Sequence, residues 1–369
     1  MKPIKWLLFP SLIAINCFAG FAQSPANGAA TNTPTGIEIV SKITKPKKKF
    51  NEKDLSGYLL VYFKDQNQSA YLAASADGYT FTDINGGQPI FIGSDLAEQK
   101  GVRDPHITRG PDGAFYLAMT DLHIFGKRAG YRETDWERPV EKYGWGNNRA
   151  LVLMKSYDLI HWTHSDFRVD TAFPELGDID CSWAPETIYD AAKKKMMVYF
   201  TIRYNNKNAG IYYAYANDDF TKLETVPQRI NDIGGIDADI TKVGDKYHMF
   251  FVGDAKVWHA VSDKINADYK ANKEQRIDPE KVSTEAPNVF KRLGTDTYVL
   301  MYDVYGARPS NMGFSETTDF VNFKDIKHFN EGVMKTTNFT SPKHGAVTYL
   351  TKDELKAIAE HWNVKLNTN

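Results

Sequence analysis

Short runs of apolar and aromatic residues, separated by turn residues, follow one another along the chain from Gly57 onward. With 20 tyrosines and 21 phenylalanines, the chain is rich in the residue types that pack well on pleated strands. A helical pattern of apolar positions appears only in Lys352 to Ile358. The pattern predicts an all-β domain over residues 57–350 and a short C-terminal helix or tail over residues 351–369.

A turn signature, in which a small or acidic cluster precedes an aromatic or apolar residue, recurs after strand-like runs. Its copies are SADGYTF (75–81), SYDLIHW (156–162), NDDFTKL (217–223), ETTDFVNF (316–323) and a weaker VSDKINADY (261–269). Because regular self-similarity indicates a repeat architecture, these copies predict five sheets.

A second signature precedes each sheet after the first and leads to an aromatic-rich strand. Its copies are RDPHI (103–107), WAPETI (183–188), IDADI (236–240) and EAPNVF (285–290). When Asp104, Ala184, Asp237 and Ala286 are aligned, the spacings are 80, 53 and 49 residues. The long first interval contains an insertion at residues 121–148.

Four-stranded sheets repeated in this way are typical of a five-bladed β-propeller, whose opening strands line a central channel. We expect GAVTYL (345–350) to close the ring by pairing with the first sheet, residues 57–81. A β-sandwich with fortuitous Asp-Pro turns is the alternative, and the regular pairing of the two signatures disfavours it.

The N-terminus has the pattern of a secretory signal peptide. A charged start precedes an apolar stretch at residues 6–18, which is too short for a membrane span, and small residues occupy the cleavage positions 20–22. We expect a signal peptide over residues 1–22, a leader over residues 23–56, and export to the periplasm or the cell exterior.

The composition narrows the classes of partner. Lysine plus arginine (45) nearly equals aspartate plus glutamate (46), and no basic stripe is present, which argues against nucleic acid. Lipid attachment at Cys17 is disfavoured by Asn16 before it. Removal of the signal would leave only Cys181, so no intramolecular disulfide is expected. We expect a monomer with no membrane span.

Carboxylates that converge in a channel with aromatic residues suggest hydrolysis of a glycosidic bond. One protonated acid must donate its proton to the leaving oxygen. One ionised carboxylate must either take a proton from the attacking water or act as the nucleophile. A third carboxylate can raise the pKa of the acid through like-charge repulsion.

The ordered set RDPHI, WAPE, IDADI and EAPNVFK resembles glycoside hydrolase family 43 over roughly residues 57–350. The resemblance implies a five-bladed propeller with inverting chemistry on arabinose- or xylose-containing plant polysaccharides, and no cofactor for the chemistry. It implies Asp104 as general base, Asp237 as the residue that tunes the acid, and Glu285 as general acid. Asp239, two positions after Asp237, competes for the tuning role.

Other residues have expected roles in binding. Glu186 stands where the family usually has Asp, and we count it with Asp239 among the substrate-binding residues. Trp145, in the insertion, would belong to a lid or a surface loop, and Trp183 would stack on a sugar or pack in the core. Arg103 and Arg308 would bind sugar hydroxyls or neutralise carboxylates.

His344 in PKHGAV matches a family histidine that often helps to hold a channel metal, commonly calcium. The other eight histidines show no zinc-like spacing. A packed histidine without metal is the alternative.

Two further alternatives stay open for the function. One is a retaining β-fructosidase, which would need a first-blade nucleophile that only Asp65 loosely offers. Another is a carbohydrate-binding propeller without hydrolysis. Within the favoured family, the long insertion favours an exo-acting enzyme, with α-L-arabinofuranosidase ranked first and β-xylosidase second.

Overall fold

The computed structural model describes residues 35–47, 49–230, 233–273, 275–307, 310–329, 331, 333, 339–340 and 342–366. The expected signal peptide and Arg308 lie outside the described residues. No helix in the described part of the chain is long and apolar enough to span a membrane.

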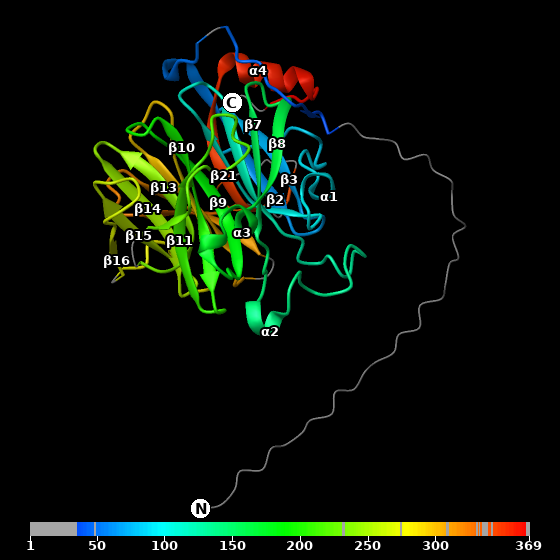
Figure 1. Cartoon of the computed structure of the whole chain (residues 1–369). Coiled ribbons are helices and arrows are strands. Elements are labelled where there is room, and N and C mark those ends of the chain that lie inside the picture. The colour runs from blue at the N-terminus through cyan, green and yellow to red at the C-terminus, as the bar shows by residue number, and fades with distance from the viewer. Residues whose placement is uncertain are drawn as a thin grey trace, which may run out of the picture. The chain divides into compact units, whose positions relative to one another are not determined.

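The strands form five sheets (Figure 1). The first sheet is ordered β21(Lys343–Thr351), β2(Leu55–Lys64), β3(Ser69–Ser75), β4(Thr82–Asp83). The second is β5(Val102–Arg109), β6(Phe115–Asp121), β7(Ala150–Ser156), β8(His161–Arg168), with β1(Glu38–Ile39) parallel to β8 at its outer edge. The third is β9(Cys181–Asp190), β10(Lys195–Tyr204), β11(Asn208–Tyr215), β12(Gln228–Arg229).

The fourth sheet is β13(Ile236–Val243), β14(Lys246–Gly253), β15(Lys256–Ser262), β16(Lys270–Asn272). The fifth is β17(Glu285–Lys291), β18(Tyr298–Val304), β19(Asn311–Thr317), β20(Lys324–His328). The helices are η1(Glu52–Asp54), α1(Gly93–Leu96), α2(Val140–Tyr143), α3(Val169–Ala172), η2(Pro174–Leu176) and α4(Lys352–His361).

The first strand of each sheet contacts the first strand of the next, in the cyclic order β21, β5, β9, β13, β17 and back to β21. These five inner strands surround one axis, and the apolar faces of neighbouring sheets pack into the cores between blades. The expected five-bladed β-propeller is confirmed.

The ring is closed by strands from the two ends of the domain. β21 pairs antiparallel with β2, so that Tyr349 lies opposite Tyr58, and Figure 1 shows these two strands side by side. This is the pairing expected for GAVTYL. Helix α4 follows directly, and Thr351 starts it with a capping box to Glu354.

Every inner strand is interrupted near its start by the same kind of β-bulge, in which two residues lie opposite one residue of the second strand. The first bulged residue has a positive φ in each case. These residues, which we call the bulge residues, are Asp104 (φ 49°), Ala184 (45°), Asp237 (48°), Ala286 (56°) and His344 (29°). A residue with a Cβ is strained in this conformation, and such strain concentrates at functional sites.

Closure by β21 predicts a large effect of a core substitution in that strand. Leu350 is fully buried between the first and second blades. We expect Leu350→Ala to lower the free energy of unfolding by about 2–5 kcal/mol, because it leaves a cavity. The exposed Val321 is the control, and Val321→Ala should change that free energy by less than about 0.5 kcal/mol. Urea denaturation measures both, and equal effects would contradict a packed closure strand.

Candidate active site

The repeated bulge arranges side chains from all five inner strands in two layers. The upper layer consists of each bulge residue and the residue before it: Arg103 and Asp104, Trp183 and Ala184, Ile236 and Asp237, Glu285 and Ala286, Lys343 and His344. The lower layer consists of the residues two positions after each bulge residue: His106, Glu186, Asp239, Asn288 and Ala346. The three carboxylates expected to be catalytic all lie in the upper layer.

Asp104 is held by a histidine and a threonine. Its Oδ1 lies 3.1 Å from Nδ1 of His344, and its Oδ2 accepts a hydrogen bond of 2.8 Å from the Thr120 hydroxyl. The Thr120 oxygen in turn accepts the backbone N–H of Ala184 at 2.8 Å. Burial alone would raise the pKa of Asp104, but the charges of His344 and Arg103 outweigh it and lower the pKa to about 2. Asp104 is therefore ionised at neutral pH.

His344 is surrounded by carboxylates. Its backbone N–H donates to both oxygens of Asp303, at 3.0 and 3.1 Å. Burial alone would lower the pKa of His344, but Asp104, Asp237 and Asp303 raise it to about 9. The imidazole is therefore protonated at neutral pH and forms an ion pair with Asp104. The expected role of His344 in holding a channel metal stays a prediction.

Two more buried carboxyl groups lie beside this pair. Burial raises the pKa of Asp237, and the negative charges of Glu285 and Asp104 raise it further. The positive charge of His344 lowers it, and the resulting pKa is about 7. Burial likewise raises the pKa of Asp303 to about 7, against the opposing charge of Lys343. Both groups are therefore partly protonated near neutral pH.

Glu285 begins β17 and keeps 30% of its side chain exposed. Its Oε1 lies 3.8 Å from Nζ of Lys343, and it faces Asp303 across the β17–β18 ladder. The same lysine lies 3.5 Å from Oδ2 of Asp65. Glu285 is thus the most accessible of the three expected catalytic carboxyl groups, beside one cation.

Arg103 also lies in the upper layer, but its guanidinium has partners within the protein. It donates to Oδ1 of Asp65 at 2.7 Å and to the side-chain oxygen of Gln68 at 3.3 Å, and it lies 4.5 Å over the Phe63 ring. These contacts supply the neutralising role that the sequence allowed for it. They also occupy Asp65, the loose candidate for a first-blade nucleophile.

Three tryptophans extend outward from the upper layer. Trp183 is nearly buried, and its indole N–H donates to the carbonyl of Gly146 at 2.6 Å. The ring of Trp145 lies edge-to-face at 5.7 Å from Trp183, and that of Trp136 at 5.2 Å from Trp145. Trp145 remains 49% exposed. An exposed indole is a surface on which a sugar ring could stack.

The loop that carries Trp145 is attached to the third blade. The guanidinium of Arg203 lies 4.5 Å over the Trp183 ring and donates to the carbonyls of Tyr143 and Trp145, the latter at 2.8 Å. The amide of Asn147 donates to the carbonyl of Gly144 at 2.9 Å. This part of the insertion is therefore held by specific hydrogen bonds.

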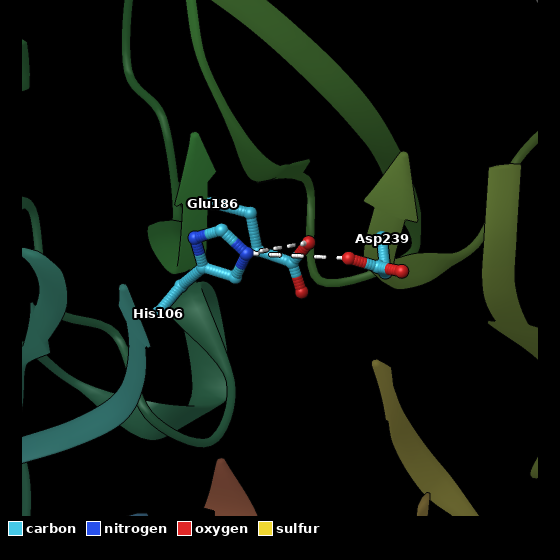
Figure 2. Close-up of side chains that lie close together, drawn as sticks. All are labelled: His106, Glu186 and Asp239. Atoms are coloured by element: carbon cyan, nitrogen blue, oxygen red, sulfur yellow. Dashed lines mark ion pairs between the residues drawn. The ribbon is translucent and has the colours of Figure 1, made fainter. Parts of the chain in front are cut away.

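The lower layer contains a compact buried group, His106, Glu186 and Asp239, shown in Figure 2. Nε2 of His106 lies 3.9 Å from Oε2 of Glu186 and 4.0 Å from Oδ1 of Asp239. The exposed fractions of Glu186 and Asp239 are 2% and 3%. Their expected role in substrate binding stays a prediction, while their contacts here are internal.

The sequence did not predict several residues that the structure places in the site. Thr120 and Asp303 stand on the second strands of their blades, where only the strand register places them beside Asp104 and His344. Lys343 could have been found, because KHGAV is a fifth copy of the blade-opening signature. Aligned with RDPHI, it puts Lys343 level with Arg103.

The bridging role of Thr120 predicts a stability effect. Thr120→Val keeps the shape of the side chain but leaves the buried Ala184 N–H and one Asp104 oxygen without their partner. We expect the free energy of unfolding to fall by about 1–3 kcal/mol in urea denaturation. Thr241, a partly exposed strand residue, is the control, and Thr241→Val should change little. An equal change in both variants would mean that the hydroxyl is not a bridge.

Residues 53–356 match the family described as "Probable glycosyl hydrolase domain", which is related to glycoside hydrolase family 43. A search of the curated proteins finds no match. The catalytic domain of the GH62 α-L-arabinofuranosidase from Coprinopsis cinerea is 16% identical, with a TM-score of 0.46 over 65% of this chain and 73% of that chain. The GH43_1 enzyme from Xanthomonas citri in complex with xylose is 14% identical, with a TM-score of 0.44 over 62% of this chain and 73% of that chain. The family match extends from β2 to β21 and so includes all five inner strands.

Proposed function

The chain belongs to the glycosyl hydrolases related to family 43 and is a glycosidase, and we propose that it is an inverting, exo-acting enzyme for arabinose- or xylose-containing plant polysaccharides. One observation carries the proposal. Asp104, Asp237 and Glu285 come from three blades, and the charges of the other two carboxyl groups and of His344 all act on Asp237. Two carboxyl groups with different proton affinities are what glycosidic hydrolysis requires.

Asp104 is the general base in this proposal. It is ionised at neutral pH, and Thr120 and His344 each hold one of its oxygens. A water beside it would lose a proton to the carboxylate as the water oxygen attacks the anomeric carbon. In inverting enzymes the base stands about 6.5–9.5 Å from the acid, which leaves room for that water.

Glu285 is the general acid. It is partly exposed at the start of β17, and it would give its proton to the glycosidic oxygen as the bond to the anomeric carbon breaks. Asp237 is the tuning residue in this proposal, because the charges of Glu285 and Asp104 both act on it within the upper layer. Asp239 is the weaker candidate, since its two oxygens accept from the Asn288 side chain and the Val289 backbone.

Trp145 supplies the binding surface for the sugar on the leaving-group side, and Trp183 supports it from beneath. The long insertion favours removal of terminal units. We rank α-L-arabinofuranosidase first and β-xylosidase second. The chemistry needs no cofactor, since two carboxyl groups and water suffice. The signal-like residues 1–22 support export, and we propose a monomer.

Removal of either carboxyl group tests the chemistry. We expect Asp104→Ala and Glu285→Ala to reduce hydrolysis of arabinoxylan oligosaccharides by about 10²–10⁴-fold, as for loss of a general base or acid. With p-nitrophenyl α-L-arabinofuranoside and β-xyloside, Glu285→Ala should lose less, because that leaving group needs little protonation. The exposed Asp296 is the control, and Asp296→Ala should keep full activity.

The configuration of the product distinguishes the alternatives. Proton NMR of the first product should show inversion at the anomeric carbon, whereas retention would favour the β-fructosidase-like mechanism. Full activity of Asp104→Ala would exclude it as the base. Binding of oligosaccharides without any hydrolysis across a substrate panel would favour the binding-module alternative.

The role of Trp145 is tested separately from the chemistry. We expect Trp145→Ala to raise KM for oligosaccharides about tenfold, which corresponds to about 1.4 kcal/mol, with kcat nearly unchanged. KM for p-nitrophenyl glycosides should change little, because they lack the further sugars. Trp145→Phe should restore most of the binding. A fall in kcat alone, on all substrates, would contradict a binding role.

A further inference from the structure

The lower layer forms a network that reaches all five inner strands. His106 on β5 contacts β9, because its Nδ1 lies 3.2 Å from both the hydroxyl and the backbone nitrogen of Thr187. Glu186 on β9 lies beside Asp239 on β13, with a carboxylate oxygen of each within 4.8 Å of the other. Asn288 on β17 donates to Asp239 at 3.2 Å and accepts from the backbone N–H of Val347 on β21 at 3.0 Å.

The backbone of Thr187 determines the protonation of His106. A backbone N–H can only donate, so Nδ1 of His106 must present its lone pair to it. The ring proton of the neutral imidazole is therefore on Nε2, which faces Glu186 and Asp239 (Figure 2). Burial lowers the pKa of His106 to about 3, in agreement with a neutral ring. A metal at Nε2 would require the proton on Nδ1, against the Thr187 N–H.

The two carboxyl groups need one proton between them. Tyr199 donates to Oε2 of Glu186 at 2.9 Å, since the tyrosine oxygen itself accepts the backbone N–H of Ile240 at 2.8 Å. Asp239 accepts from the Asn288 amide and the Val289 N–H. Two buried carboxylates whose oxygens lie within 4.8 Å of each other repel strongly, so one of the two groups keeps a proton. Burial, followed by the negative charge of Asp239, raises the pKa of Glu186 well above its usual range.

We propose that the lower layer of this propeller is a proton site and not a cation site: Glu186 and Asp239 share one proton, and His106 directs its Nε2–H toward both. The group offers one nitrogen and two carboxylate oxygens within 4.8 Å of one another, which is a plausible donor set for a divalent ion. The fixed tautomer of His106 excludes that use. This inference does not depend on the proposed function, because its readouts are metal content and stability.

The sign of the pH dependence follows from these groups. Burial raises the pKa of Asp239 to about 7, and that of Glu186 also rises, so the folded chain keeps a proton that the unfolded chain releases near pH 4. The stabilisation is present below about pH 4 and is lost as the pH rises through about 7. The other charged and titratable groups that face the site are Asp237, Tyr199, Tyr349 and His344.

The experiment uses the purified full chain and Glu186→Gln, whose amide N–H replaces the shared proton permanently. Elemental analysis by plasma mass spectrometry should find no stoichiometric metal in the wild type. EDTA, CaCl2 and ZnCl2 should leave its Tm unchanged. Between pH 5 and 8 the Tm of the wild type should fall, and Glu186→Gln should recover about 4 °C of that fall.

Glu98→Gln is the matched control, because Glu98 belongs to the other acidic group of the described residues that could hold a metal, with Asp121 and Asp166. It is the control for metal content alone, because the charge of Glu98 contributes to the raised pKa values of Asp121 and Asp166. One metal per chain that is lost in Glu186→Gln and kept in Glu98→Gln would overturn the proposal. So would an unchanged pH dependence in folded Glu186→Gln.

If Glu186→Gln does not fold, His106→Gln distinguishes a bound proton from a bound metal ion. Its amide N–H still faces the carboxyl groups, but it removes the imidazole that a metal would need. A proton site predicts a folded variant with the pH dependence of the wild type. A Tm that depends on added Ca²⁺ or Zn²⁺ in the wild type and loses that dependence in His106→Gln would refute the proton site.

Discussion

The arrangement of the site depends on one backbone constraint, the bulge that interrupts every inner strand at the same level. Each bulge holds a residue other than glycine at positive φ, and four of the five are Asp104, Ala184, Asp237 and His344. Because of the bulge, the residue before each bulge residue and the residue two positions after it lie in two separate layers around one axis. Strain of this kind persists only when the surrounding sheet packing imposes it. The propeller thus supplies the rigidity that the site uses.

Charge is separated between the two layers. The upper layer holds ionised Asp104 against protonated His344, with Asp237 and Asp303 near the midpoint of their titration at neutral pH. The lower layer keeps its histidine, His106, neutral. The two histidines therefore have opposite protonation states, because Asp104, Asp237 and Asp303 raise the pKa of His344, whereas burial and the charge of His344 lower the pKa of His106.

The sequence predicted the propeller and the convergence of Asp104, Asp237 and Glu285, because ordered copies of one signature place their residues level with one another. It could not place Asp303, which stands in the aromatic strand DTYVLMYDV and meets the site only through the register of β18 against Glu285. The sequence indicated His344 as a site residue but could not predict Asp104 as its partner, since the ion pair joins residues 240 positions apart in sequence. Side-chain partners across blades are set by the packing of the ring, which local patterns do not encode.

The closing strand β21 has a consequence for synthesis of the protein. It delivers Lys343 and His344 to the upper layer, and the backbone of Val347 to the lower one. A ribosome makes these residues after the other four inner strands, so a nascent chain has neither the closed ring nor the partner of Asp104 until β21 has emerged. Fragments that end before residue 343 therefore carry the three acidic residues in a ring that remains open, and the site assembles only when β21 joins the ring.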